Sequence, residues 1–122
     1  MSEFFYDSYA FIEYFNGNPH FKPYFEKHTG ITTLFNVAEV YYSLLHDKGK
    51  AAADDILPTL LSLIVEVDGE IIQKAMLFRF FHRKQKLSYA DCIGYGISRE
   101  RGIPFLTGDV RFKDIKDVEF VK

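Results

Sequence analysis

The sequence predicts an α/β fold of three layers, α/β/α, in which helices cover both faces of a five-stranded, mostly parallel sheet. Short apolar runs alternate along the chain with longer segments of helical periodicity, and strands separated by helices generally pair in parallel. A length of 122 residues suits one domain with a substantial core. A hydrophobic content of 48% and an aromatic content of 17% favour a folded globule over a disordered chain.

Five segments are predicted to be strands because each is short, largely apolar and bounded by polar or turn-forming residues. The first is rich in aromatic residues, as expected for a buried strand, and Gly69 stops the third. The predicted strands are residues 3–7, 30–33, 64–68, 103–107 and 118–121. Parallel sheets collect functional groups at the carboxyl ends of their strands, near the point where the strand order reverses.

Helical periodicity fills the intervals between these segments. Ser8 can cap a helix that carries Phe11, Ile12 and Phe15 on one face, and the Asn-Gly-Asn-Pro run at 16–19 breaks it. The remaining predicted helices are residues 23–27, 34–45, 51–63, 70–86 and 88–101.

Residues at the helix boundaries support this division. Thr33 can cap the helix that follows it, and Gly102 can stop the last one. The Asp-Lys-Gly-Lys run at 47–50 predicts a turn. Pro58 should kink or split the helix in which it lies, because proline lacks the backbone N–H that a helix interior needs.

Composition also bears on location and partners. A net charge of −2 carries no nucleic-acid signature, but an acidic metal cluster would lower the net charge without making a binding surface acidic. Cys92 is the single cysteine, which excludes an internal disulfide and fits a reducing compartment. No apolar run reaches the length of about 18 residues that a membrane span needs, and the N-terminus has no signal-peptide pattern. We therefore expect a cytoplasmic protein.

Four acidic residues carry most of the functional information. Asp7 ends the first apolar run, and Asp109 follows the run at 103–107. Glu39 lies inside one helical pattern, and Asp91 opens another. If the two strands that precede Asp7 and Asp109 are neighbours, their carboxyl ends bring two carboxylates together, and two helices can supply the others.

Each acid also has an ordinary structural explanation. Asp7 can end a strand or cap a helix, Glu39 can be a solvated helix residue, and Asp109 suits a turn after glycine. The Ser-Tyr-Ala-Asp run that ends at Asp91 has the spacing of a capping box. The four acids taken together favour a functional site more strongly than any one of them does alone. Four carboxylates held together repel one another, whereas Mg²⁺ or Mn²⁺ stabilises them and can promote phosphodiester hydrolysis.

The chain resembles a PIN-domain ribonuclease, of the toxin type found in VapBC toxin–antitoxin pairs. The resemblance is carried by four motifs, in family order, across nearly the whole chain. They are Phe5-Tyr6-Asp7-Ser8, Thr33-x-x-Asn36-x-x-Glu39, Leu87-Ser88-Tyr89-Ala90-Asp91-Cys92-Ile93 and Phe105-Leu106-Thr107-Gly108-Asp109-x-x-Phe112.

The resemblance implies one PIN-like domain over residues 1–122, with strand order 3-2-1-4-5. It implies a metal-dependent endoribonuclease with Mg²⁺ (or Mn²⁺) as cofactor, RNA as substrate, a homodimeric state and an antitoxin partner. It also implies a catalytic and metal-binding quartet, with three supporting polar residues beside it. The quartet is Asp7, Glu39, Asp91 and Asp109, and the supporting residues are Ser8, Asn36 and Thr107.

Two departures from the family pattern stand out. Many relatives carry a further acid two positions after the last aspartate, and here that position is Arg111. The helix after Asp91 contains Gly94 and Gly96, which weaken a helix but permit close packing against a neighbour. We expect these departures to affect substrate choice more than the metal site.

Basic residues interleaved with aromatics at 79–86 are the predicted RNA contact, because such a segment can pair with phosphates and stack on bases. The candidates are Arg79, Arg83, Lys84 and Lys86, with Arg111 beside the acids. A solvated helix end, where cations complement the helix dipole, would explain the same segment.

Two other functions remain open at this stage. One is a PIN-like fold that has lost catalysis and only binds RNA or protein. The other is a phospho-receiver domain, with Asp68 at the end of the third predicted strand as phospho-acceptor. Aromatic residues such as Tyr42 and Phe81 can belong to the core, to a dimer face or to an antitoxin groove.

Overall fold

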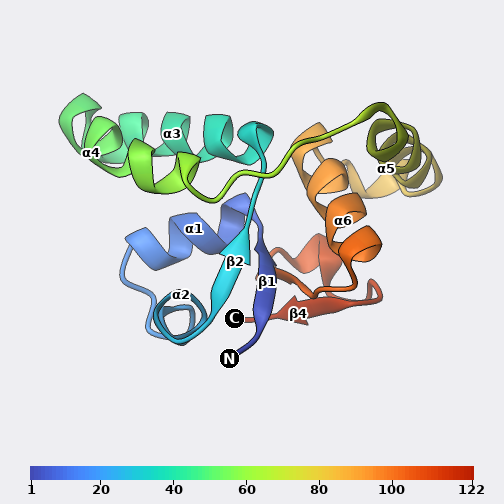
Figure 1. The fold of residues 1–122 in the computed structure, drawn as a ribbon, viewed down its shortest axis with the longest axis horizontal. Helices are drawn as coiled ribbons and strands as arrows, with labels where there is room; N and C mark the ends of the chain where they lie inside the picture. The colour runs from blue at the N-terminus through green and yellow to red at the C-terminus, as the bar shows by residue number, and fades with distance from the viewer.

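A parallel sheet of four strands runs through the middle of the molecule, and helices lie on both sides of it (Figure 1). The computed structural model describes residues 1–122. The strand order is β2-β1-β3-β4, and every neighbouring pair is parallel. The strands are β1 (Glu3–Tyr6), β2 (Thr29–Ile31), β3 (Phe105–Thr107) and β4 (Val118–Phe120).

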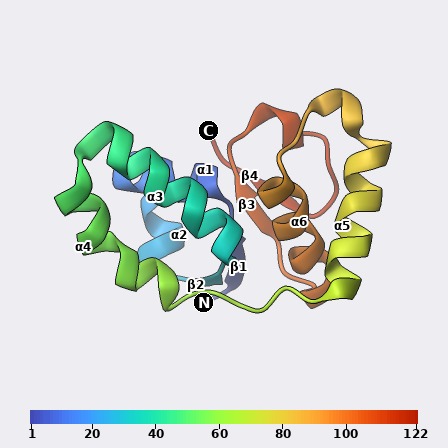
Figure 2. The ribbon, with the colours of Figure 1, turned by 90° about the horizontal axis from the view of Figure 1, so that it is seen from above.

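Two groups of helices form the outer layers, as seen from above in Figure 2. The first four helices of the chain pack on one face of the sheet, and the last two pack on the other. The three-layer α/β architecture expected from the sequence is confirmed. The helices are α1 (Ser8–Phe15), α2 (Lys22–Glu26), α3 (Leu34–Lys48), α4 (Lys50–Leu61), α5 (Gly69–Phe81) and α6 (Tyr89–Arg101), with short 3-10 turns η1 (Arg83–Gln85) and η2 (Val110–Phe112).

The pleat of β1 divides the core into two. Successive side chains of a strand point to opposite faces, so Phe4 and Tyr6 join the cluster under α1, α3 and α4. Phe5 points the other way, into the cluster under α5 and α6, where its ring lies 5.6 Å from that of Phe105. A Cβ on Gly94 would lie 2.5 Å from the Phe5 ring, so α6 can approach β1 this closely only because that residue is glycine.

The prediction of a third strand at residues 64–68 is wrong. Its first residue makes an isolated bridge, in which Ile64 pairs in parallel with Thr32, and no ladder follows. Two observations explain this. The segment that contains Thr32 enters α3 at Leu34, so it offers no further residues for strand pairing. The segment after Ile64 then crosses from one helical layer to the other to reach α5 (Figures 1 and 2). The predicted order 3-2-1-4-5 is therefore reduced to four strands, with the bridge at the place of the missing edge strand.

Two predictions about the boundaries of α3 and α4 also need correction. The turn expected at 47–50 is shorter, because α3 continues to Lys48 before Gly49 ends it. Pro58 does not split α4, which runs without a break to Leu61. Only Thr59, Leu60 and Leu61 follow Pro58 in α4, so the missing N–H falls near the helix end, where the loss of one bond is tolerated.

The basic segment is not one continuous helix. We expected a helix over 70–86, but α5 ends at Phe81, where the backbone N–H and the ring of His82 both contact the carbonyl of Phe78. A 3-10 turn follows, and the chain reverses at Lys86 with φ of 57°. None of the helices is both long enough and apolar enough to cross a membrane.

Candidate active site

Asp7 lies at the carboxyl end of β1, beside the end of β3. These two strands are neighbours, and the strand order reverses between them, which is where parallel sheets hold functional groups. The Thr107 hydroxyl donates a hydrogen bond of 2.7 Å to Oδ2 of Asp7. Asp7 is only 1% exposed, and its other oxygen, Oδ1, is buried without a hydrogen-bond partner. An orphaned buried carboxylate oxygen is costly unless a ligand satisfies it.

The pKa of Asp7 is raised to about 8, chiefly by burial and also by the negative charges of Asp91 and Glu39. These effects outweigh the hydrogen bonds from the Thr107 hydroxyl and the Ser8 backbone, which lower that pKa. Burial and the two negative charges disfavour the ionised form of Asp7. A cation at Oδ1 would reverse the balance, because it would favour the carboxylate.

Glu39 reaches the site through a chain of hydrogen bonds. The hydroxyl of Ser8 donates to Oε1 of Glu39 at 2.7 Å, and the amide of Asn36 donates to the same hydroxyl at 3.0 Å. Thr33, which caps α3 as predicted, donates its hydroxyl to Oδ1 of Asn36 and so orients that amide. The supporting polar residues predicted beside the quartet therefore lie next to Asp7 and Glu39.

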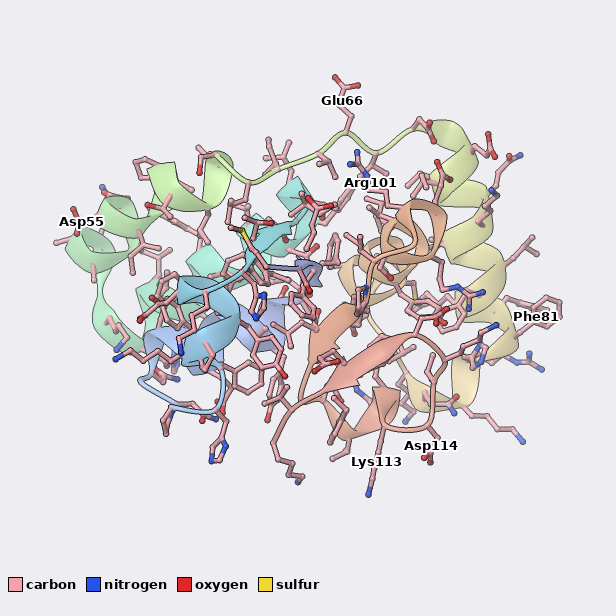
Figure 3. All side chains as sticks on the ribbon, turned by 60° about the horizontal axis from the view of Figure 1, so that its bottom comes forward. Asp55, Glu66, Phe81, Arg101, Lys113 and Asp114 are labelled. Carbon is pink, nitrogen blue, oxygen red and sulfur yellow. The ribbon has the colours of Figure 1, made fainter.

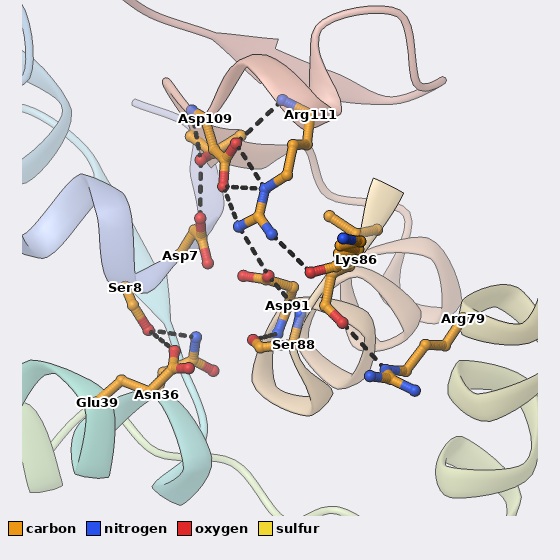
Figure 4. Close-up of polar contacts among 12 residues, drawn as sticks. Asp7, Ser8, Asn36, Glu39, Arg79, Lys86, Ser88, Asp91, Asp109 and Arg111 are labelled. Carbon is orange, nitrogen blue, oxygen red and sulfur yellow. Dashed lines mark hydrogen bonds and ion pairs between the residues drawn. The ribbon is translucent and has the colours of Figure 1, made fainter. Parts of the chain in front are cut away.

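Asp91 is held at the N-terminus of α6 by the predicted capping box. The backbone N–H of Ser88 donates to Oδ2 of Asp91 at 2.8 Å, and the N–H of Asp91 donates to the Ser88 hydroxyl. The structural explanation for Asp91 is thus correct, and it coexists with a position beside the other acids (Figure 4).

Asp109 caps η2 and is paired with Arg111. Its two carboxylate oxygens lie 3.1 and 3.0 Å from Nε of Arg111, and Nη2 of that guanidinium also contacts Oδ2. Burial alone would raise the pKa of Asp109, but the hydrogen bonds and charge of Arg111 outweigh burial and hold that pKa below its usual value. Arg111 also reaches Oδ2 of Asp91 at 3.3 Å, so it bridges two of the four predicted ligands.

The four acids lie in one region, but each has hydrogen-bond or ion-pair partners of its own and they do not converge on a point (Figure 4). No three acidic, histidine or cysteine side chains are arranged to hold a metal ion as they stand. In kind the residues fit a hard divalent cation, because all four candidate ligands are carboxylates and Asp7 has an unused buried oxygen. Oxygens of two of these acids, Asp109 and Asp91, are at present occupied by Arg111.

The predicted RNA-contact residues divide into two sets. Arg79 donates to the carbonyl of Leu87 and lies 4.7 Å over the Tyr89 ring, while Arg83 lies 4.8 Å over the Phe80 ring. Both arginines are therefore engaged locally. Lys84 and Lys86 are exposed on the turn that leads toward Asp91. The carbonyl of Lys86 accepts a hydrogen bond of 2.8 Å from Nη1 of Arg111, which joins this turn to the acids.

Sequence reasoning missed two features here. Tyr89 is 60% exposed and lies two residues before Asp91, where an exposed aromatic ring is available for stacking. Its position in the motif was the only signal. The bridging contacts of Arg111 had no local signal, because one partner lies 20 residues away in the chain.

A model of the PIN domain family matches residues 4–118. The chain belongs to the PIN domain family. No curated protein matches the chain.

Several solved structures of other proteins share this fold at low sequence identity. The chain is similar to VapC20 of Mycobacterium tuberculosis, described as a sarcin-ricin loop cleaving toxin, with a TM-score of 0.80, 19% identity and coverage of 99% of this chain and 100% of that one. It is also similar to a chain of a toxin-antitoxin complex from Klebsiella pneumoniae, with a TM-score of 0.74, 18% identity and coverage of 97% and 95%. A chain of DNA-bound VapBC from Salmonella typhimurium gives a TM-score of 0.74, 14% identity and coverage of 98% and 97%.

The PIN fold does not leave Asp68 in the place that a phospho-receiver needs. Asp68 follows no strand, and its side chain caps α5 by accepting a hydrogen bond of 2.9 Å from the N–H of Ile71. The receiver alternative therefore loses its acceptor.

Proposed function

We propose that this PIN-domain protein is a metal-dependent endoribonuclease that hydrolyses RNA phosphodiester bonds, and that it is the toxin of a toxin–antitoxin pair. The observation that carries the proposal is the buried Asp7, whose Oδ1 has no partner and which lies among Asp91, Asp109 and Glu39 (Figure 4). Similarity to a chain of a toxin-antitoxin complex and to a sarcin-ricin loop cleaving toxin supports the same activity.

In the proposed site, Asp7, Asp91 and Asp109 hold Mg²⁺ or Mn²⁺ directly or through water. Such an ion, when bound, lowers the pKa of a water and stabilises the charge that develops on a phosphoryl group. Glu39 completes the cluster or accepts a proton from the attacking water. Thr107 orients Asp7, and Ser8 with Asn36 orients Glu39, through the hydrogen bonds given above.

The RNA strand is proposed to pass over the turn that precedes α6. Lys84 and Lys86 would pair with phosphates, and Tyr89 offers an exposed ring beside Asp91. Arg79 and Arg83 would add positive charge from the end of α5. This arrangement would bring the backbone of the RNA across the carboxylates.

Assembly with a second copy and with an antitoxin is proposed on the exposed apolar side chains. Large apolar residues remain exposed on α3 and on α5, where Phe81 projects away from the body of the molecule (Figure 3). They are Leu34, Phe35, Tyr42, Leu77, Phe80 and Phe81. Contiguous exposed apolar surface marks protein interfaces. Light scattering measures the mass directly, and a monomer at micromolar concentration would contradict the homodimer.

A cytoplasmic location is proposed as well. Cys92 is free and buried, and burial raises the pKa of its thiol to about 11, so it is present as an unreactive thiol that needs no oxidising compartment.

The test of function is cleavage of a mixed pool of structured RNAs with Mg²⁺, Mn²⁺ or EDTA. The wild type should cut with either metal and not in EDTA, and Asp7→Asn should not cut while it retains the native circular dichroism spectrum. Full activity in Asp7→Asn would exclude the assigned site. RNA binding without metal-dependent cleavage would favour instead a PIN-like protein that only binds.

A further inference from the structure

Arg111 is the one cation embedded in the acidic cluster, and all of its side-chain nitrogens have partners. Nε and Nη2 contact Asp109, Nη2 also contacts Asp91, and Nη1 donates to the carbonyl of Lys86. The guanidinium therefore ties η2 to the N-terminus of α6 and to the turn before it.

The charges around Arg111 are unequally compensated. One positive charge serves Asp91 and Asp109, whose side chains are only 8% and 16% exposed. Asp7, the third predicted ligand, receives no contact from Arg111, and its Oδ1 is left buried and unpartnered. The cluster thus has a cation on one side and an unfilled acceptor on the other.

We propose that Arg111 competes with the divalent cation for the carboxylates of Asp91 and Asp109. It holds both carboxylates in the metal-free protein, and it must leave them before the metal can bind. This inference rests on the proposed metal site. It concerns a residue at which the chain departs from the acid found in many PIN relatives, so it describes a property of this chain.

Competition follows from the geometry of the shared oxygens. A Mg²⁺ ion sits about 2.0–2.1 Å from its carboxylate ligands and demands near-octahedral geometry. The Asp109 oxygens already face Nε, and Oδ2 of Asp91 is already shared between the N–H of Ser88 and Nη2 of Arg111. A guanidinium on the same oxygens would block the metal's approach and repel its charge.

The position of Arg111 allows the side chain to leave. It lies on η2, a short 3-10 turn at the surface, and its side chain is 39% exposed. Asp109 and Asp91 are held independently by backbone hydrogen bonds, from the N–H of Arg111 and the N–H of Ser88 respectively. The two carboxylates therefore keep their places when the guanidinium moves out.

The test is direct Mn²⁺ binding, measured by electron paramagnetic resonance on wild type, Arg111→Gln, Arg101→Gln and Asp7→Asn. Arg101 is a matched control because it is an exposed arginine at the opposite end of α6, about 15 Å along the helix from Asp91. We expect Arg111→Gln to bind Mn²⁺ at least about tenfold more tightly than wild type, equivalent to about 1.4 kcal/mol. Arg101→Gln should match wild type, and Asp7→Asn should bind much more weakly.

A second readout covers the case in which Arg111→Gln folds poorly. In EDTA its melting temperature should fall below that of wild type, because Asp91 and Asp109 then repel without a counter-ion, and saturating Mn²⁺ should remove or reverse the difference. Unchanged or weaker Mn²⁺ binding by Arg111→Gln, with binding still lost in Asp7→Asn, would overturn the competition and leave the metal site standing. No Mn²⁺ binding by any of the four proteins would overturn both.

Discussion

The two halves of the acidic cluster are stabilised in different ways. At the end of β1, Asp7 and Glu39 are partnered by the neutral hydroxyls of Thr107 and Ser8, and one buried oxygen has no partner. At the N-terminus of α6, Asp91 and Asp109 share the charge of Arg111. The first half still requires a cation to be stable in its ionised form, whereas the second half already contains one.

This difference separates stability from function. Removing the charge of Asp7 from the first half should maintain or raise the stability of the fold and abolish the proposed RNA cleavage. Removing the charge of Asp91 from the second half should lower both stability and cleavage.

The paired variants Asp7→Asn and Asp91→Asn should each reduce RNA cleavage on the order of a thousandfold, because each removes a proposed metal ligand. Their stabilities in EDTA should differ in sign. Asp7→Asn should unfold at the same temperature as wild type or higher, since it removes a buried carboxylate with an orphaned oxygen. Asp91→Asn should lose about 1 kcal/mol with its ion pair and its charge at a helix N-terminus. Equal shifts in calorimetry would refute the contrast.

Gly94→Ala should destabilise the protein by about 1–3 kcal/mol in urea denaturation, because the new methyl group would meet the fully buried Phe5 ring. Gly94 sets how closely α6, and with it Asp91, approaches the Asp7 half. Gly96→Ala is the control, since its Cβ would lie 3.7 Å from that of Ala75 and alanine favours helix. A stability loss as large in Gly96→Ala as in Gly94→Ala would contradict this packing argument.

Thr107→Val should cost about 0.5–1.5 kcal/mol in thermal unfolding, because it removes the hydroxyl that donates to Asp7 and accepts from the N–H of Asp109. Thr107→Ser retains the hydroxyl and should lie close to wild type. The prediction fails if the two variants melt together, since the hydroxyl would then contribute nothing.

The smallest effect is expected for the double variant Lys84→Gln with Lys86→Gln. It should weaken binding of single-stranded RNA a few-fold at low salt and reduce the slope of log affinity against log salt by about 1.4, the value for two lost phosphate contacts. A matched loss of two exposed lysines elsewhere, Lys27→Gln with Lys48→Gln, should leave that slope unchanged. An unchanged slope in the first variant would remove these lysines from the proposed RNA path.

Sequence reasoning did well where the signal was local. Four of the five predicted strands, the caps at Thr33 and Ser88 and the glycine stop at Gly102 are present at the predicted places. The residue types in the four motifs were enough to indicate the PIN family, which the match over residues 4–118 confirms. It did less well at Ile64 and Phe81, where a strand and a helix were expected to continue and did not.

Most elements, the caps at Thr33 and Ser88 and the set of acids could therefore be predicted from the sequence, because periodicity and capping depend on residues a few positions apart. The expected cap at Ser8 was wrong, since Asp7 lies at the N-cap position of α1. Only the tertiary structure decided that β1 lies beside β3, that Ile64 pairs once and stops, and that Arg111 joins Asp109 to Asp91. These outcomes depend on where distant segments meet in space. Strand partners and an ion pair between a 3-10 turn and a helix N-terminus are fixed by packing of the whole chain, which no short window of sequence contains.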